Sequence, residues 1–129
     1  MPLIRFDMIE GSTETEITKI LDVAHIAVVE AFKVPEGDRY QIVHQHHASE
    51  MIIKDTGLGF ERSKNVIVIT ITSRNRSSEK KEALYKKLAL GLKEECNIDP
   101  VDIMVSMVFN EGEDWSFAFG RAQFLTGEL

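Results

Sequence analysis

Hydrophobic residues recur along the first third of the chain with two different periods. Residues 3–9 alternate weakly and are rich in strand-forming side chains, and Gly11 ends this segment. Thr13 and Glu16 have the spacing of a capping box, in which each side chain accepts a hydrogen bond from the other residue's backbone N–H. Apolar residues then follow at helical spacing, at Ile17, Ile20, Leu21, Ala24, Val28 and Phe32. We therefore expect a strand and then a helix, which Pro35 and Gly37 end.

Strand and helix patterns occur again after residue 38. Residues 39–45 predict a second strand, residues 51–54 a further short strand, and Thr56-Gly57 a turn. The β-branched run at residues 66–72 is typical of a strand buried on both faces.

A second helix is expected after this run. A serine at position 77 or 78 can cap it, and Asp99-Pro100 breaks it. Its apolar positions are Ala83, Leu84, Leu88, Leu92 and Cys96. Residues 103–109 then predict the matching strand, and residues 115–125 form an aromatic tail with short extended pieces.

Strand, helix and strand thus occur twice, at an offset of about 63–65 residues, which indicates a duplicated unit. We expect an α/β fold in a single domain at 1–129, with pseudo-repeats at about 1–63 and 64–129. Each unit needs a right-handed crossover and a parallel strand pair. Joining the two units predicts a four-stranded sheet with both helices on one face. The other face would be apolar and uncovered, so other subunits are its simplest cover.

Charge and cysteine content narrow the classes of function. The net charge of −6 argues against a general nucleic-acid binder, which needs a basic face. No apolar stretch approaches the roughly 20 residues of a membrane span, and no secretory signal is evident at the N-terminus. The single cysteine, Cys96, excludes an internal disulfide and a cysteine-based zinc site, and a reducing cytoplasm is the expected compartment.

Pro2 is the first residue that can carry chemistry. Removal of Met1, which is usual when the next residue is small, would leave a secondary amine at the chain start. An α-amino group titrates near pH 8, and such an amine can act as a base, as an acid or as an iminium-forming nucleophile. The alternative is that Pro2 is only a convenient small second residue.

Arg74 and Arg76 lie between the predicted third strand and second helix, where two guanidiniums can clamp a carboxylate or phosphate. The alternative is a solvated basic loop. Pro2 starts one central strand and the arginines end the other, so they meet only if these strands are antiparallel or another subunit intervenes. Asp38 precedes the second strand and can pair with a protonated amine, or is merely a turn residue or a partner of Arg39.

Three further groups have a structural interpretation beside a functional one. His44, His46 and His47 suggest a metal site, but no acidic or thiol ligand has a typical spacing, so we expect a half-exposed strand. Cys96 lies on the apolar stripe of its helix and is expected to be a buried small hydrophobe, and the GLG at 57–59 a turn. The late aromatic residues are expected to line an apolar pocket, or to belong to the core or to a subunit interface: Trp115, Phe117, Phe119 and Phe124.

Taken together, these features resemble the tautomerase superfamily, and within it the malonate semialdehyde decarboxylase family. The stretches that carry the resemblance span the chain and are PLIRFDMIEG, VPEGDRYQIVHQH, DTGLGF, TSRNRS and DWSFAFGRAQFLTGEL. The resemblance implies a homotrimer without metal or organic cofactor. It assigns the catalytic amine to Pro2 and the catalytic aspartate to Asp38. It assigns carboxylate binding to Arg74 and Arg76, and an apolar wall to Trp115 and Phe117, with Phe124 and Leu129 as further candidates.

The implied activity is decarboxylation of a small carboxylate, malonate semialdehyde, to acetaldehyde and CO₂. A hydratase or an enol–keto tautomerase acting on a related unsaturated or 2-oxo acid is the alternative, and it needs the same amine. A trimeric binding protein without catalysis is a third hypothesis, under which changes at Pro2, Asp38 or the arginines leave the function intact.

Overall fold

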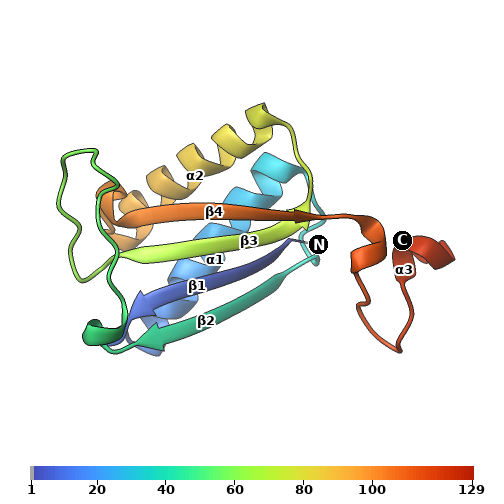
Figure 1. Ribbon diagram of the computed structural model, residues 1–129, viewed down its shortest axis with the longest axis horizontal. Coiled ribbons are helices and arrows are strands. Elements are labelled where there is room, and N and C mark those ends of the chain that lie inside the picture. The colour runs from blue at the N-terminus through green and yellow to red at the C-terminus, as the bar shows by residue number, and fades with distance from the viewer. Residues whose placement is uncertain (1) are drawn as a thin grey trace.

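Four strands form one mixed sheet in the order β2-β1-β3-β4 in the computed structural model, which describes residues 2–129 (Figure 1). The strands are β1 (Leu3–Ile9), β2 (Tyr40–His46), β3 (Ile67–Arg74) and β4 (Ile103–Asn110). Two long helices, α1 (Glu14–Phe32) and α2 (Ser78–Cys96), connect β1 to β2 and β3 to β4. The short elements are η1 (Ala48–Glu50), η2 (Pro100–Asp102), η3 (Gly112–Asp114) and α3 (Gln123–Thr126).

The predicted duplicated β-α-β unit is confirmed. β1 pairs with β2 in parallel, and β3 pairs with β4 in parallel, as two right-handed crossover units require. The two units join through β1 and β3, which are antiparallel. Sequence alone left that direction open, and it decides which ends of the two central strands meet.

Both long helices begin where their sequence signals predict and end slightly earlier. Thr13 and Glu16 form the expected capping box, and the Ser77 hydroxyl caps α2 by accepting from the backbone N–H of Lys80. Each helix ends on a residue in the left-handed conformation, Lys33 after α1 and Asn97 after α2. These caps stop the helices before Pro35 and Asp99-Pro100, which lie in the connections that follow.

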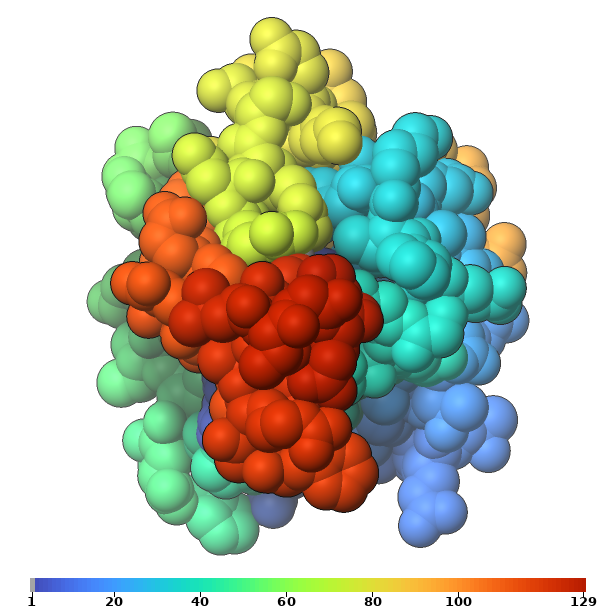
Figure 2. All heavy atoms as spheres, turned by 90° about the vertical axis from the view of Figure 1, so that its right-hand side faces the viewer, coloured from blue at the N-terminus to red at the C-terminus, as the bar shows by residue number. Residues whose placement is uncertain are grey.

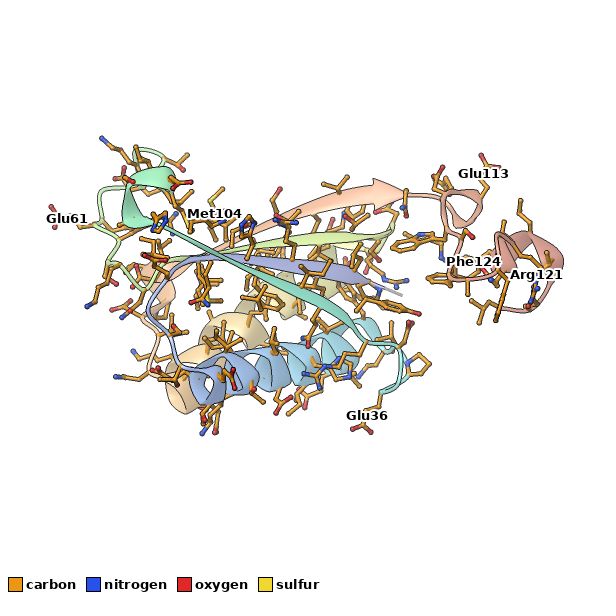
Figure 3. The ribbon with its side chains drawn as sticks, turned by 90° about the horizontal axis from the view of Figure 1, so that it is seen from below. Glu36, Glu61, Met104, Glu113, Arg121 and Phe124 are labelled. Atoms are coloured by element: carbon orange, nitrogen blue, oxygen red, sulfur yellow. The ribbon has the colours of Figure 1, made fainter. Side chains whose placement is uncertain are left out.

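One face of the sheet carries both helices and holds the core between the layers (Figure 3). Its largest fully buried side chains come from the two central strands and the facing helices, and include Phe6, Ile69, Ile71, Val28, Leu84, Leu88 and Leu92. The helices approach closely at Gly91, where an added Cβ would lie 2.9 Å from Cγ1 of Val23. Because side chains alternate along a strand, every second residue of β1 and β3 points into the core, and the others point to the opposite face of the sheet, which carries no helices.

The prediction of a short strand at residues 51–54 is wrong. The chain passes through η1 and then forms no ladder with any of the four strands, and Ile52 is 77% exposed. Apolar residues alone do not make a strand, because the backbone also needs a neighbouring ladder. Here the side chain of Arg62 donates to the carbonyl of Lys54 instead. The turn expected next is confirmed, because the Asp55 carboxylate accepts from the backbone N–H groups of Gly57 and Gly59.

The second face of the sheet has no helix layer. In β3 this face is half-buried, so the strand expected to be buried on both sides is fully buried on one side only. Several large apolar side chains are exposed on this open face: Tyr40, Ile42, Met104 and Val108. Among the described residues, no helix is long and apolar enough to cross a membrane.

Candidate active site

The candidate residues meet at the end of the sheet where β1 and β2 start and β3 ends (Figure 1). Leu3 faces Thr72 in the antiparallel ladder, which puts Pro2 opposite Ser73 and next to Arg74. Leu3 also faces Tyr40 in the parallel ladder, so the chain before β2, with Asp38, lies on the other side of Pro2. The antiparallel pairing of β1 and β3 therefore brings the chain start to the arginines within a single chain.

Pro2 is among the most deeply buried residues of the chain. The loop that carries Asp38 is fixed by the backbone N–H of Asp38, which donates to the carbonyl of Pro35 at 3.0 Å. The pKa of Arg76 is lowered, mainly by burial and next by Arg74, and the negative charge of Asp38 only partly opposes this shift, so Asp38 and Arg76 interact across the site. Pro2 thus lies among an acidic group and two basic groups.

The two arginines contact aromatic rings in different parts of the molecule. The ladder ends at Arg74, whose guanidinium carbon lies 4.3 Å from the ring centre of Phe124 in the C-terminal tail. Arg76 lies in the connection to α2, and its guanidinium carbon is 5.2 Å from the ring centre of Phe32 at the end of α1. Burial, and next the positive charge of Arg74, lower the pKa of Arg76. Partial desolvation and a neighbouring cation both favour a bound anion here.

The tail contributes an aromatic wall beside these groups. Trp115 and Phe117 stack at 5.3 Å between ring centres, and Phe117 meets Phe124 edge to face at 5.7 Å. Tyr40 at the start of β2 stacks on Phe117 at 5.8 Å and joins the tail to the sheet. The indole N–H of Trp115 donates to Oδ1 of Asn110 at the end of β4. The wall is therefore held at the start of β2 and at the end of β4, which are the two edge strands of the sheet.

The C-terminal segment bends back over the end of the sheet, where it faces the viewer in Figure 2. Gln123, which is 7% exposed, fixes this bend by accepting from the backbone N–H of Phe117 and donating to the carbonyl of Ala118. Phe124 lies on the side of the tail toward the sheet in Figure 3, whereas Arg121 lies at the outer end. Phe119 and Leu129 are 83% and 68% exposed, so within the single chain neither is part of the wall.

Sequence reasoning missed Tyr40, Asn110 and Gln123 as parts of this site. Tyr40 was visible only as a strand former. Its position two residues after Asp38 was the available signal, because a strand start carries its neighbours to the same sheet end. Nothing in the local sequence links Asn110 or Gln123 to Trp115 or Phe117.

The histidines of β2 lie on the open face and acquire an acidic neighbour from another strand. The parallel register pairs His44 with Asp7, and Nε2 of His46 lies 2.7 Å from Oδ1 of Asp7. The possible ligand atoms of these three residues lie within 4.8 Å of one another. However, the Arg5 guanidinium donates to Nδ1 of His44 at 2.7 Å, which puts a fixed positive charge against the group. These contacts are those of a polar strand pair.

Cys96 lies at the opposite end of the molecule from Pro2. It borders a cavity of about 550 Å³ that also touches Ile9, Lys19 and Lys64. Cys96 is half-buried against the core, not fully buried as expected, because it occupies the last turn of α2. Burial is the main cause of the raised pKa of its thiol, which disfavours the nucleophilic thiolate.

Comparisons with known proteins find relatives that match along the whole chain. Two family models, each described as a tautomerase enzyme, match residues 38–118 and 2–61. The protein of Bacillus subtilis (strain 168) described as probable tautomerase YrdN is 57% identical over 129 residues and covers all of both chains. A crystal structure of malonate semialdehyde decarboxylase, described with decarboxylase and hydratase activities, has a TM-score of 0.96 and 50% identity, covering 98% of each chain. A second malonate semialdehyde decarboxylase, FG41, inhibited by 3-bromopropiolate, has a TM-score of 0.94 and 35% identity, covering 98% of this chain and 97% of that one.

Proposed function

This chain belongs to the tautomerase family, and on that premise we propose that it decarboxylates malonate semialdehyde to acetaldehyde and CO₂ through the amine of Pro2. The observation that carries the proposal is the meeting of Pro2, Asp38, Arg74 and Arg76 at one sheet end. The match to malonate semialdehyde decarboxylase at 50% identity along almost the whole chain supports the choice of substrate.

In the proposed reaction the arginines bind the substrate carboxylate. They hold the bond between the carboxylate carbon and the neighbouring carbon out of the carbonyl plane, so that it overlaps the π system. When that bond breaks, its electron pair moves toward the carbonyl and CO₂ departs. Protonation of the resulting enolate carbon then gives acetaldehyde.

Pro2 can stabilise the developing charge in two ways. Protonated Pro2 donates a hydrogen bond to the carbonyl oxygen, where the negative charge accumulates. Neutral Pro2 instead condenses with the carbonyl, with loss of water, to an iminium that accepts the electron pair more strongly. The resulting enamine is then protonated at carbon, and water hydrolyses the product iminium to acetaldehyde and the free amine. Asp38 favours the protonated amine, and the arginines oppose it. Neither route needs a metal or an organic cofactor.

The aromatic wall has a separate role in this proposal. A carboxylate held by two cations is stabilised in the ground state, which by itself slows its loss. Trp115 and Phe117 offset this by offering an apolar, water-poor surface to the departing CO₂. Tyr40 and Phe124 support the wall through the ring contacts described above.

Product analysis tests the proposal. The protein, with the absence of Met1 verified by mass spectrometry, is incubated with malonate semialdehyde and followed by proton NMR. We expect acetaldehyde to form much faster than with a Pro2→Ala variant at equal concentration. If the amine is free and acetaldehyde forms no faster than without protein, the decarboxylase proposal is wrong.

Hydration or enol–keto tautomerisation at the same site is the second candidate. It is favoured by the similarity to a structure described with both decarboxylase and hydratase activities and to a probable tautomerase. The substrates to test are acetylenic or haloacrylic acids and phenylenolpyruvate. Only the decarboxylase releases CO₂, so measuring CO₂ separates the two candidates.

We also propose that the chain assembles as a homotrimer through the open face of its sheet. The exposed apolar side chains on that face, Tyr40, Ile42, Met104 and Val108, support an additional protein layer. Light scattering during gel filtration is expected to give three times the chain mass of 14.6 kDa. A stable monomer at micromolar concentration would contradict the proposal, and Ile42→Glu is expected to weaken the assembly. Leu90→Glu, an exposed site on α2, is the matched control.

A further inference from the structure

Ser73, the penultimate residue of β3, is buried without a hydrogen-bond partner. It is 1% exposed, and its hydroxyl contacts no donor or acceptor. Within residues 2–129, the buried side-chain atoms in this state are Oγ of Ser73 and Nε of Arg76, and both lie at the end of the sheet described above. Native chains rarely leave a buried hydroxyl unpaired, because its lost hydration is then not replaced. The unpaired hydroxyl therefore indicates a hydrogen-bond partner that is absent while the chain still carries Met1.

The strand register identifies Pro2 as the neighbour of this hydroxyl. Leu3 faces Thr72, so Pro2 faces Ser73 across the antiparallel pair. Both residues are buried and belong to the side-chain series of their strands that points toward the helices. Directly opposed residues of such a pair have Cβ atoms about 4.5–5.5 Å apart.

The backbone pattern brings these two side chains closer still. The N–H of Glu10 donates to the carbonyl of His46 in β2, and successive residues of a strand direct their N–H groups to opposite sides. The N–H groups of even-numbered residues in β1 therefore point to β2, not to β3. In Pro2 the ring Cδ occupies this β2-directed position, so the hydrogens of a free amine point elsewhere. Pro2 and Ser73 then form a non-hydrogen-bonded pair, the type in which facing side chains approach most closely.

We propose that Ser73 is a positioning residue for the catalytic amine, and that its hydroxyl accepts a hydrogen bond from protonated Pro2 once Met1 has been removed. The inference rests on the proposed function, which requires a free Pro2 amine. In a chain that still carries Met1, the Pro2 nitrogen is an amide without a proton, so it cannot donate to the hydroxyl. Removal of Met1 creates the donor that the buried oxygen lacks, and the bond stabilises the protonated amine.

Several charged groups act on the same amine, so the effect of Ser73 is measured against them. Arg74 and Arg76 disfavour the protonated form from the end of β3, and Asp38 favours it from the chain before β2. Other charged and titratable groups on the elements packed at this end include His25, Lys33, Glu36, Arg39, Tyr40, Glu79, Lys81 and Glu111. Arg39 is paired with Asp22 at 2.8 Å, and Nε2 of His25 contacts the carbonyl of Glu36. The variants below leave all of these groups unchanged.

The test is the pKa of Pro2, measured by ¹⁵N NMR on protein labelled at proline and shown by mass spectrometry to lack Met1. The other two of the three prolines, Pro35 and Pro100, are amides and do not titrate. We expect Ser73→Ala to lower the pKa of Pro2 by about one pH unit, because the ammonium loses a charge-assisted hydrogen bond. Ser73→Thr keeps the hydroxyl and is expected to retain most of the original value. Thr72→Val, which removes a hydroxyl from the opposite face one residue away, is the matched control.

A purely structural serine gives a different pattern. Removal of an unpaired buried hydroxyl would raise the melting temperature of Ser73→Ala and leave the pKa of Pro2 where it was, and this result would overturn the proposal. An equal fall in Thr72→Val would overturn it as well. The proposed function fails by a separate measurement, namely undiminished decarboxylation in Pro2→Ala.

Discussion

Blocking the Pro2 amine is expected to reduce decarboxylation to the uncatalysed background. In a chain with an uncleaved N-terminal tag, the Pro2 nitrogen is an amide that has no basic lone pair and no proton to donate. It can neither hydrogen-bond to the developing enolate nor form an iminium, while the side chains of Asp38, Arg74 and Arg76 remain in place. Pro2→Ala keeps an amine but loses the ring, and we expect its kcat to fall by about 10²–10⁴-fold, the usual contribution of a positioned acid or base.

The controls separate the amine from the fold. Removing the tag so that Pro2 becomes the first residue should restore turnover in the same preparation. Pro100→Ala changes a proline in η2, at the other end of the sheet from Pro2, and is expected to leave kcat unchanged. Full turnover with the tag still attached would remove the amine from the mechanism.

Chemical trapping distinguishes the two roles of Pro2. Sodium cyanoborohydride reduces an iminium to a stable tertiary amine, which adds the reduced substrate or product skeleton to the mass of the chain. A modified N-terminal peptide and progressive loss of turnover would indicate the iminium route. Turnover that continues without any added mass would favour the hydrogen-bonding route.

The fold was predictable because its signals are local and occur twice. The capping box at Thr13 and Glu16, the serine cap at Ser77 and the β-branched run of β3 each specify one element through neighbouring residues. The short strand expected at residues 51–54 failed for the complementary reason. A strand forms only where a neighbouring strand can pair with it. The four residues at 51–54 carry no information on whether such a neighbour is present.

The site was only partly predictable, because it is made of strand ends that meet in space. Pro2, Asp38 and the arginines each suggested chemistry, but the antiparallel pairing of β1 and β3 that brings them together left no local trace. Asp7 beside His44 and His46 is another product of register across strands. Ser73 looked like an ordinary strand residue, and only its burial and its unpaired hydroxyl distinguish it.

The second large effect is expected at Arg76. Its Nε is buried without an acceptor, and its guanidinium is partly desolvated over Phe32. A substrate carboxylate would supply the missing acceptor, in surroundings where a charged hydrogen bond is stronger than in water. We expect Arg76→Lys to lower kcat/KM by about 10–100-fold, because lysine keeps the charge but loses the planar set of donors that matches a carboxylate.

The division of this loss between KM and kcat shows what the arginine does. An arginine that only binds the carboxylate raises KM when it is replaced, whereas one that also holds the breaking bond out of the carbonyl plane lowers kcat. Arg121→Lys is the matched control, because Arg121 lies in the same subunit but is engaged with Glu128 in the outer tail. If Arg76→Lys and Arg121→Lys behave alike, Arg76 is not part of a carboxylate site. If Arg76→Lys lowers kcat alone, the guanidinium acts on the transition state and not on the bound substrate, and Arg74 is left as the group that holds the carboxylate before reaction.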